Sequence, residues 1–141
     1  MSIIVVYLAN LGYWFYKNKI PFLPKVLSLV IRIIFSCQIS PGVYLGKGTI
    51  LGYGGLGVVI HGQCQIGNRV NIGTNVTLGG NFGKGGVPII ENDVFIGSGA
   101  KILGPVRIGE GAIVGANSVV LKDIPASNVY AGIPAKFIRS I

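Results

Sequence analysis

The sequence contains few acidic residues, few cysteines and a single histidine. Its 141 residues include four Asp and Glu, two Cys and one His, against twelve Lys and Arg. Two cysteines are too few for the disulfide framework of a small secreted scaffold, so we expect a reducing, cytoplasmic compartment. The net charge of +8 at pH 7 favours an anionic partner, such as a nucleotide-like cofactor, a membrane surface or a nucleic acid. No cluster of His and Cys has metal-ligand spacing, so no metal is expected.

Long apolar runs are also missing. Residues 2–16 are apolar, but about 20 residues are needed to span a bilayer, and the second run, residues 26–35, is interrupted by Arg32. The first 38 residues contain one glycine and carry large apolar side chains at helical spacing, with a break at Pro21 and Pro24. We therefore predict two short helices. Residues 1–35 either cap the rest of the chain or contact a membrane surface.

A six-residue repeat runs through the remainder of the chain. From residue 60 to residue 120 every sixth position is a branched aliphatic residue, with one exception at Lys84. The residue two places earlier is small or compact in each repeat, and glycine follows most of the aliphatic positions. Lys84 lies in a glycine-rich segment, residues 79–86, that cannot be an ordinary strand. The aliphatic positions are Ile60, Ile66, Ile72, Leu78, Ile90, Ile96, Ile102, Ile108, Val114 and Val120.

A period of six is too short for a helical repeat and too regular for a meander of strands. Each unit can form a short strand followed by a tight turn, in which glycine adopts conformations that a Cβ hinders. Three units then make one triangular coil of about eighteen residues, and stacked coils form a parallel β-helix around a column of Ile and Val. We predict an all-β fold class: a parallel β-helix over residues 39–141, preceded by a helical segment over residues 1–38.

Three further motifs resemble those of hexapeptide-repeat acyltransferases. They are the loop Leu78–Lys84, the segment Ile96–Gly104 and the ending Ala131–Lys136. The chain is similar to bacterial serine O-acetyltransferases and to the related acetyltransferases of capsule and exopolysaccharide synthesis, over about residues 39–138. The resemblance implies a left-handed β-helix, a homotrimer, and acetyl-CoA bound in the groove between neighbouring subunits.

The resemblance breaks at three places. Serine acetyltransferases carry an Asp-His pair where this chain has Gly52-Tyr53-Gly54, an Arg-His-Pro where it has Gly86-Val87-Pro88, and an aspartate where it has Gln38. The groups that hold the amino-acid substrate are therefore missing. The run Tyr53–His61 is more similar to the polysaccharide branch, so the resemblance implies transfer to a hydroxyl of a sugar or polysaccharide precursor. Serine is the alternative acceptor.

His61 is the candidate general base. Transfer of acetyl from a thioester to a hydroxyl needs a base for the hydroxyl proton and donors for the developing oxyanion, and neutral imidazole can serve as that base near pH 7. One coil separates His61 from Gly79, and further coils reach Gly97 and Gly115. We therefore expect His61 at the head of a column almost free of side chains, along which a pantetheine arm lies. No evident acyl-accepting nucleophile lies near it, which favours direct transfer in a ternary complex.

The neighbouring column supplies candidate cofactor contacts. From Gly62 the same step reaches Gly80, Ser98 and Ala116. The resemblance also places Ser98 and Ala116 where small residues of the family contact CoA.

Exposed lysines and turn residues supply the remaining candidates. Lys84 on the glycine loop is suited to closing over an anionic cofactor, although it could equally be a solvated surface charge. Asparagine in turns is more often structural than functional. The other candidate contacts are Lys101 and Lys136 for the CoA phosphates, and Tyr53, Asn71 and Asn75 for the acceptor.

Two alternatives to a glycan O-acetyltransferase follow from these observations. One is a serine O-acetyltransferase of cysteine biosynthesis. The other is a non-catalytic trimeric β-helix that serves as a scaffold. Nucleic-acid binding is not expected, because the basic residues are scattered and aromatic residues are sparse after residue 53.

Overall fold

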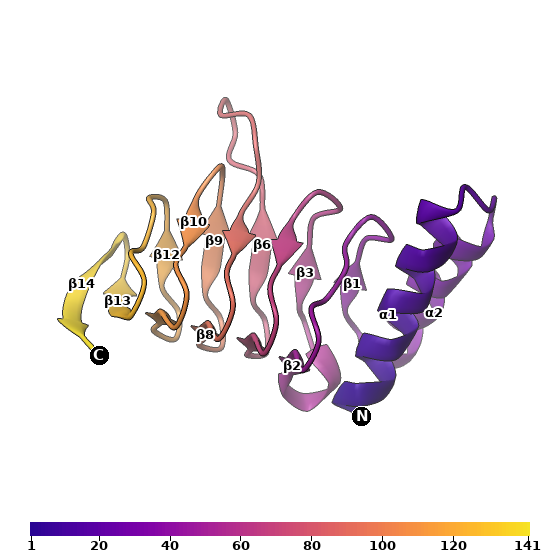
Figure 1. Cartoon of the computed structure of the whole chain (residues 1–141), viewed down its shortest axis with the longest axis horizontal. Coiled ribbons are helices and arrows are strands. Elements are labelled where there is room, and N and C mark those ends of the chain that lie inside the picture. The colour runs from indigo at the N-terminus through magenta and orange to yellow at the C-terminus, as the bar shows by residue number, and fades with distance from the viewer.

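The computed structural model describes residues 1–141 and consists of two helices stacked on one end of a parallel β-helix (Figure 1). Helix α1 spans Ser2–Lys17 and α2 spans Leu23–Phe35, with Pro24 in the first turn of α2. Ser36 ends α2 in the left-handed conformation, with φ of 53°, and its N–H donates to the Arg32 carbonyl. The two predicted helices and the predicted break between them are confirmed.

The coils form three sheets that extend along the axis of the β-helix. Each sheet consists of very short strands, which run across the axis. One sheet has the order β1-β3-β6-β9-β12, the second β10-β7-β4, and the third β14-β13-β11-β8-β5-β2. All neighbours are parallel except β13 and β14, which form an antiparallel hairpin at the C-terminal end. The strands are β1 (Gln38–Ile39), β2 (Ile50–Leu51), β3 (Val59–Ile60), β4 (Gln65–Ile66), β5 (Asn71–Ile72), β6 (Thr77–Gly79), β7 (Ile89–Ile90), β8 (Phe95–Ile96), β9 (Lys101–Leu103), β10 (Arg107–Ile108), β11 (Ile113–Val114), β12 (Val119–Val120), β13 (Asn128–Gly132) and β14 (Ala135–Ser140).

The repeated aliphatic residues form the core, as predicted. All ten aliphatic positions from Ile60 to Val120 are buried, with at most 6% of any side chain exposed. The compact residues two places earlier are buried as well, and Cys64 is among them. Each coil therefore contributes a large and a small inward side chain on every side of the triangle, which fills the interior without a second sheet layer.

The coils are not all of equal length. Ile60 pairs with Leu78, 18 residues further along the chain, whereas Leu78 pairs with Ile102, 24 residues further along. The additional residues form the loop between β6 and β7, which extends well beyond the other corners (Figure 1). The loop inserts one six-residue repeat, so the aliphatic positions before and after it keep the same period. The period therefore does not reveal that this repeat lies outside the coil.

The two helices close the open end of the β-helix. Three of their polar side chains hydrogen-bond to backbone groups, one for each sheet. Asn10 makes two hydrogen bonds of 2.9 Å with the backbone of Leu45, which bridges to β4. The Ser28 hydroxyl donates to the Ile39 carbonyl of β1 at 2.9 Å. The Ser2 hydroxyl accepts from Leu51 N–H of β2 at 2.8 Å. Residues 1–35 thus satisfy backbone groups that an uncapped coil would leave unpaired.

Capping of the β-helix explains the apolar side chains on only one face of the two helices. Val5, Ala9 and Ile31 join the core of the β-helix. Many large apolar side chains on the other faces are exposed, among them Ile3 and Phe22. Of the two helices, neither combines the length and apolar character needed to cross a bilayer.

Candidate active site

His61 immediately follows β3 and is exposed on the outside of the coil. Its backbone N–H donates to the Leu78 carbonyl of the next coil at 2.9 Å. The Nδ1 atom accepts a hydrogen bond of 3.2 Å from the backbone N–H of Gln63. In the neutral ring this bond favours a proton on Nε2. The lone pair that could accept a proton is then the one on Nδ1, so His61 becomes a base only when its bond to Gln63 N–H breaks.

The glycine loop begins one coil further along, beside His61. It leaves the coil after β6, which is the neighbour of β3 in the sheet. Asn81 and Lys84 form a tight turn at its tip, in which Lys84 N–H donates to the Asn81 carbonyl at 3.0 Å. Gly80 and Lys84 are exposed, and a Cβ added at Gly83 or Gly85 would meet no atom within 4 Å. The tip of the loop therefore stands free, whereas its base packs on the following corner, where a Cβ at Gly86 would lie 2.7 Å from Pro105.

The predicted side-chain-free column below His61 is wrong. His61 does align with Gly79, but the extra residues of the loop move Gly97 and Gly115 to the ends of β8 and β11, on a different sheet. There the glycines are required by the stacking of the coils. A Cβ added at Gly97 would lie 2.6 Å from the backbone nitrogen of Ala116. At these glycines the direction that a Cβ would take points at the next coil, so the glycines do not form an open strip.

Ser98 and Ala116 are displaced from Gly80 for the same reason. Both lie at the corners between the β8 and β11 strands and the β9 and β12 strands, and both are exposed. Ser98 Oγ accepts a hydrogen bond of 3.2 Å from Thr74 Oγ1 of the preceding coil. We call the corners at residues 52–58, 73–76, 97–100 and 115–118 the Ser98 edge. The corners at residues 40–44, 61–64, 80–88 and 104–106 form the His61 edge.

Most of the remaining candidates lie on or near the Ser98 edge. Asn75 adopts φ of 57°, and its carbonyl accepts a hydrogen bond from Lys101 Nζ. Tyr53 lies in the turn η1 (Gly52–Gly55) and is 85% exposed. Asn71 lies on the sheet of β2 and β5, while Lys136 is exposed on β14 at the C-terminal end. The structure therefore places His61, Gly80 and Lys84 on one edge of the prism and the other candidates elsewhere.

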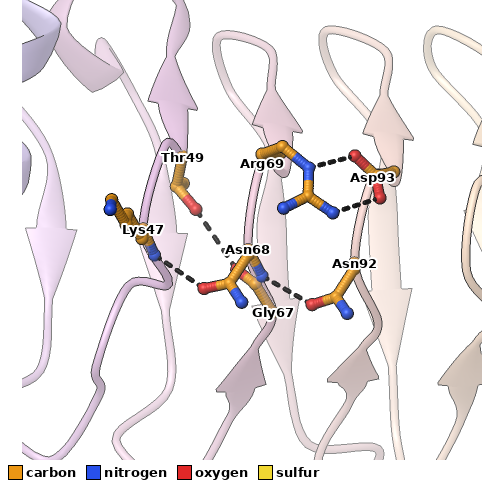
Figure 2. A network of polar contacts seen from close by, with 7 residues as sticks. All are labelled: Lys47, Thr49, Gly67, Asn68, Arg69, Asn92 and Asp93. Carbon is orange, nitrogen blue, oxygen red and sulfur yellow. Dashed lines mark hydrogen bonds and ion pairs between the residues drawn. The ribbon is translucent and has the colours of Figure 1, made fainter.

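The third edge of the prism holds most of the polar network, which the sequence analysis did not identify. At residues 67–70 and 91–94, Asn68 and Asn92 occupy equivalent corners, and each side-chain oxygen accepts a backbone N–H from the preceding coil at 2.9 and 2.8 Å (Figure 2). Arg69 and Asp93 form two parallel bonds of 2.6 and 2.7 Å (Figure 2). The motif that could have predicted this ladder occurs twice in the sequence, as Gly67-Asn68-Arg69-Val70 and as Glu91-Asn92-Asp93-Val94. We call these corners the Asp93 edge.

Three of the four acidic side chains hydrogen-bond to groups other than His61. The Arg69 guanidinium, through its hydrogen bonds and its charge, lowers the pKa of Asp93. The pKa of Glu91 is lowered by hydrogen bonds from Arg107 and from the backbone of Glu110. Asp123 accepts the backbone N–H of Arg107 at 2.8 Å. No carboxylate hydrogen-bonds to His61, so no acidic side chain orients the imidazole within the chain.

Neither thiol is a candidate nucleophile. Burial raises the pKa of both Cys37 and Cys64 to about 11, although a backbone hydrogen bond from His61 opposes this shift at Cys64. Thiolates are therefore scarce at neutral pH. Cys64 Sγ lies 3.6 Å from the Leu78 carbonyl, inside the coil.

Two adjoining hollows flank α2 and were not predicted from the sequence. Their volumes are about 440 and 260 Å³, and both are lined by Arg32 and Gln38. Helix α2 presents Arg32 beside the first strand of the β-helix. Sequence spacing could not place a residue of the helical segment against a particular sheet.

Comparison with known proteins adds to this geometry. Residues 88–122 match the family described as bacterial transferase hexapeptide (six repeats). A serine acetyltransferase of Helicobacter pylori is 38% identical over 131 residues, which cover 92% of this chain and 76% of that protein. A serine acetyltransferase of Synechococcus elongatus is 38% identical over 131 residues, which cover 92% of this chain and 53% of that protein. The crystal structure of the Brucella abortus serine acetyltransferase in complex with coenzyme A has a TM-score of 0.92 at 34% identity, over 96% of this chain and 54% of that chain.

The stacked coils and these similarities define a hexapeptide-repeat protein with a left-handed parallel β-helix, as the resemblance implied. The chain belongs to the serine acetyltransferase family. It spans about half the length of the Synechococcus and Brucella proteins. The relatives favour serine acetyltransferase, the alternative in the sequence analysis, over the polysaccharide branch.

Proposed function

We propose that the chain is an acetyl-CoA-dependent O-acetyltransferase whose acceptor is a small hydroxyl compound, with L-serine as the first candidate. One observation carries the proposal: the only imidazole is exposed at the end of β3, directly beside the free glycine loop with Lys84. Family membership supports acetyl-CoA as the donor and serine as the acceptor. Lys84 would contact the phosphates of the donor from the loop.

In this proposal His61 removes the proton of the acceptor hydroxyl. The ring first gives up its bond to Gln63 N–H, because a base needs a free lone pair facing the hydroxyl. Transfer is direct, since both thiols are buried and no hydroxyl side chain hydrogen-bonds to His61. Backbone N–H groups near the loop would hold the developing oxyanion.

A homotrimer with shared sites is part of the proposal. His61 and Lys84 lie on one edge of the prism, and Ser98 and Ala116 lie on another, with the β3 and β6 strands between them. One molecule of acetyl-CoA could contact both groups only if the His61 edge of one copy faces the Ser98 edge of another. Sedimentation velocity should therefore give a trimer, and a monomer with full activity would contradict the shared site.

An O-acetyltransferase acting on an uncharged glycan is the second candidate. It is favoured by Gly52-Tyr53-Gly54 and Gly86-Val87-Pro88, which lack the charged side chains that the family uses to hold serine. Tyr53 is exposed and could stack on a sugar ring. Asn71 and Asn75 are the further predicted contacts to the acceptor.

The experiment is an acceptor screen with the purified chain, acetyl-CoA and detection of released CoA thiol. L-serine, nucleotide sugars and neutral oligosaccharides are compared at equal concentration. Serine-dependent thiol release, with O-acetylserine identified by mass spectrometry, is the expected result. Release with oligosaccharides alone would favour the glycan acceptor. No release with any acceptor, together with no binding to immobilised CoA, would leave the non-catalytic scaffold.

Membrane contact through residues 1–35 is a separate part of the proposal. The turn between the helices is flanked by Lys17, Lys19 and Lys25, and its Phe22 side chain is 80% exposed. Aromatic and basic side chains together favour the interface of an anionic bilayer. The chain should sediment with vesicles that contain phosphatidylserine and dissociate at high salt. Equal binding to neutral vesicles, or none to either, would contradict this contact.

A further inference from the structure

A hollow of about 290 Å³ lies where helix α1 meets the first coils, outside the glycine loop, the ladder and the predicted cofactor contacts. It combines two aromatic rings with two side-chain amides, and none of the seven residues that line it is charged. The chain as a whole carries a net charge of +8, so this neutral lining sets the hollow apart from its surroundings. Its ring and amide groups belong to Tyr13, Tyr44, Gln63 and Gln65.

The two tyrosines form a platform that is held in place by neighbouring residues. Their ring centroids lie 5.5 Å apart, and the ring planes are tilted by 50°. Asn10 lies one helical turn before Tyr13 and makes two hydrogen bonds of 2.9 Å with the backbone of Leu45. Leu45 directly follows Tyr44, which still exposes 48% of its surface. A ligand can therefore bind to a ring that is already ordered, which lowers the entropic cost of binding.

The two amides stand beside this platform and have no partners within the chain. Leu45 bridges to Ile66 in parallel register. The residues before them, Tyr44 and Gln65, therefore come side by side on neighbouring coils. Gln63 and Gln65 are two residues apart and both exposed, so both side chains leave the outer face. Their hydrogen bonds use only their backbone N–H groups, which leaves each amide free to donate and to accept.

An aromatic face with free amides at its edge can recognise a sugar ring. A pyranose has a face of C–H groups, which packs on an aromatic ring, and a rim of hydroxyls, which need both donors and acceptors. The two tyrosine rings contact each other directly, so a flat nucleobase cannot enter between them. The hollow offers no cation to a carboxylate or phosphate. The ligand class that fits best is an uncharged sugar.

We propose that Tyr13, Tyr44, Gln63 and Gln65 form a binding site for a neutral sugar residue, whose ring lies on Tyr44 and whose hydroxyls bond to the two amides. This inference goes beyond the proposed function, because binding requires neither acetyl-CoA nor a base. The site shares one corner with the proposed base, since Gln63 N–H donates to His61 Nδ1 at 3.2 Å. Of the two candidate acceptors, a glycan would use this site and L-serine would not.

The test is binding of the methyl glycosides of glucose, galactose and N-acetylglucosamine to the full chain without acetyl-CoA, followed by NMR. Saturation transfer to the sugar protons, with shifts of the Gln63 and Gln65 side-chain amides, is expected for at least one glycoside. Tyr44→Ala should weaken its binding about tenfold, and Gln65→Ala about threefold to tenfold. Tyr44→Phe keeps the ring and should bind within about threefold of the wild type.

The matched control is Tyr7→Ala, which removes an exposed tyrosine from another part of α1 and should bind the glycoside normally. A thermal melting curve of each variant checks that the fold is intact. No binding of any glycoside, or an equal loss in Tyr7→Ala, would overturn the site. Tighter binding of adenosine or of methyl glucuronide would assign the hollow to a nucleobase or an anion instead.

The remaining outcomes separate this site from the proposed function. A raised KM for acetyl-CoA in Tyr44→Ala would assign the hollow to the donor and overturn the sugar site. Glycoside binding that Tyr44→Ala removes and Tyr44→Phe keeps would support the site even if no acetyl transfer occurs. Serine acetylation by a chain that binds none of the glycosides would reject the site and retain the proposed function.

Discussion

The Asp93 edge and the His61 edge lie on either side of the same short sheet and use polar side chains in opposite ways. On the Asp93 edge, side-chain oxygens accept backbone N–H groups of the neighbouring coil and one guanidinium is paired to a carboxylate (Figure 2). On the His61 edge, the imidazole has a single backbone partner and Lys84 has no ion pair. Stacked coils leave little room for polar groups, so a group without a structural partner on this fold is free to bind a ligand.

The largest expected effect is at the imidazole. His61→Ala should lower kcat by about 10²–10⁴-fold, because it removes the proposed base. The free energy of unfolding should change by less than about 0.5 kcal/mol, since the side chain is exposed. Steady-state thiol release and urea unfolding measure the two quantities.

A second substitution separates a base from a hydrogen-bond donor. His61→Gln keeps a donor but cannot accept the proton, so it should be as inactive as His61→Ala. Substantial activity in His61→Gln would mean that Nε2–H, which the Gln63 bond favours, polarises the thioester carbonyl instead. Near-normal turnover in both variants would remove His61 from the mechanism.

The thiol beneath the His61 edge should be inert. At neutral pH a pKa of about 11 leaves roughly a hundredth of the thiolate that is present in an unfolded chain. Alkylation of Cys64 by iodoacetamide at pH 7.5 should therefore be at least about a hundredfold slower in the native chain than in urea. Rapid native alkylation, located by peptide mass spectrometry, would show that the edge opens and would reintroduce a covalent intermediate.

A pair of glycines tests the difference in packing. A Cβ at Gly67 on the Asp93 edge would lie 2.8 Å from the Asn92 nitrogen, whereas a Cβ at Gly85 in the loop meets nothing within 4 Å. Gly67→Ala should therefore cost about 1–3 kcal/mol of unfolding free energy, and Gly85→Ala less than about 0.5 kcal/mol. Urea denaturation of both variants measures this, and similar costs would mean that the two edges pack alike.

The smallest expected effect comes from the exposed ion pair. The lowered pKa of Asp93 in the folded chain means that its carboxylate contributes stability above its unfolded pKa, near 4, and loses it as the pH falls through the folded value. Asp93→Asn should thus reduce the melting temperature slightly at pH 7 and not at pH 2. Solvent and salt screen this pair, so a large loss at pH 7 would show that the ladder acts as one unit.

The fold could be predicted because every repeat has the same local preference for a short strand followed by a tight turn. Ile60, Ile66 and Ile72 recur with glycine and small residues in fixed positions, and only a coil with three short strands buries every one of them. The loop could be predicted from Lys84, which breaks the aliphatic pattern. The greater length of the coil that contains the loop could not be predicted, because an insertion of one repeat preserves the period.

The site was predictable only in part. His61 and Lys84 were identified by their chemistry and Gly80 by counting, and the structure places all three on one edge. Ser98 and Ala116 were assigned to the same column by counting, and the loop shifted them to another edge. The roles of Tyr13 and Asn68 depend on which element or coil lies against them, and no spacing within the sequence contains that information.

The sequence by itself determined the period, the inward column of aliphatic side chains and the helical segment ahead of them, since these depend on local preference and burial. Only the tertiary structure decided the register between coils, because one six-residue loop changes the side of the triangle on which every later residue falls. It also decided that Ser2, Asn10 and Ser28 cap the three sheets, and that Tyr13 packs against Tyr44. Contacts of this kind join residues far apart in the chain, and they are fixed by how the elements pack.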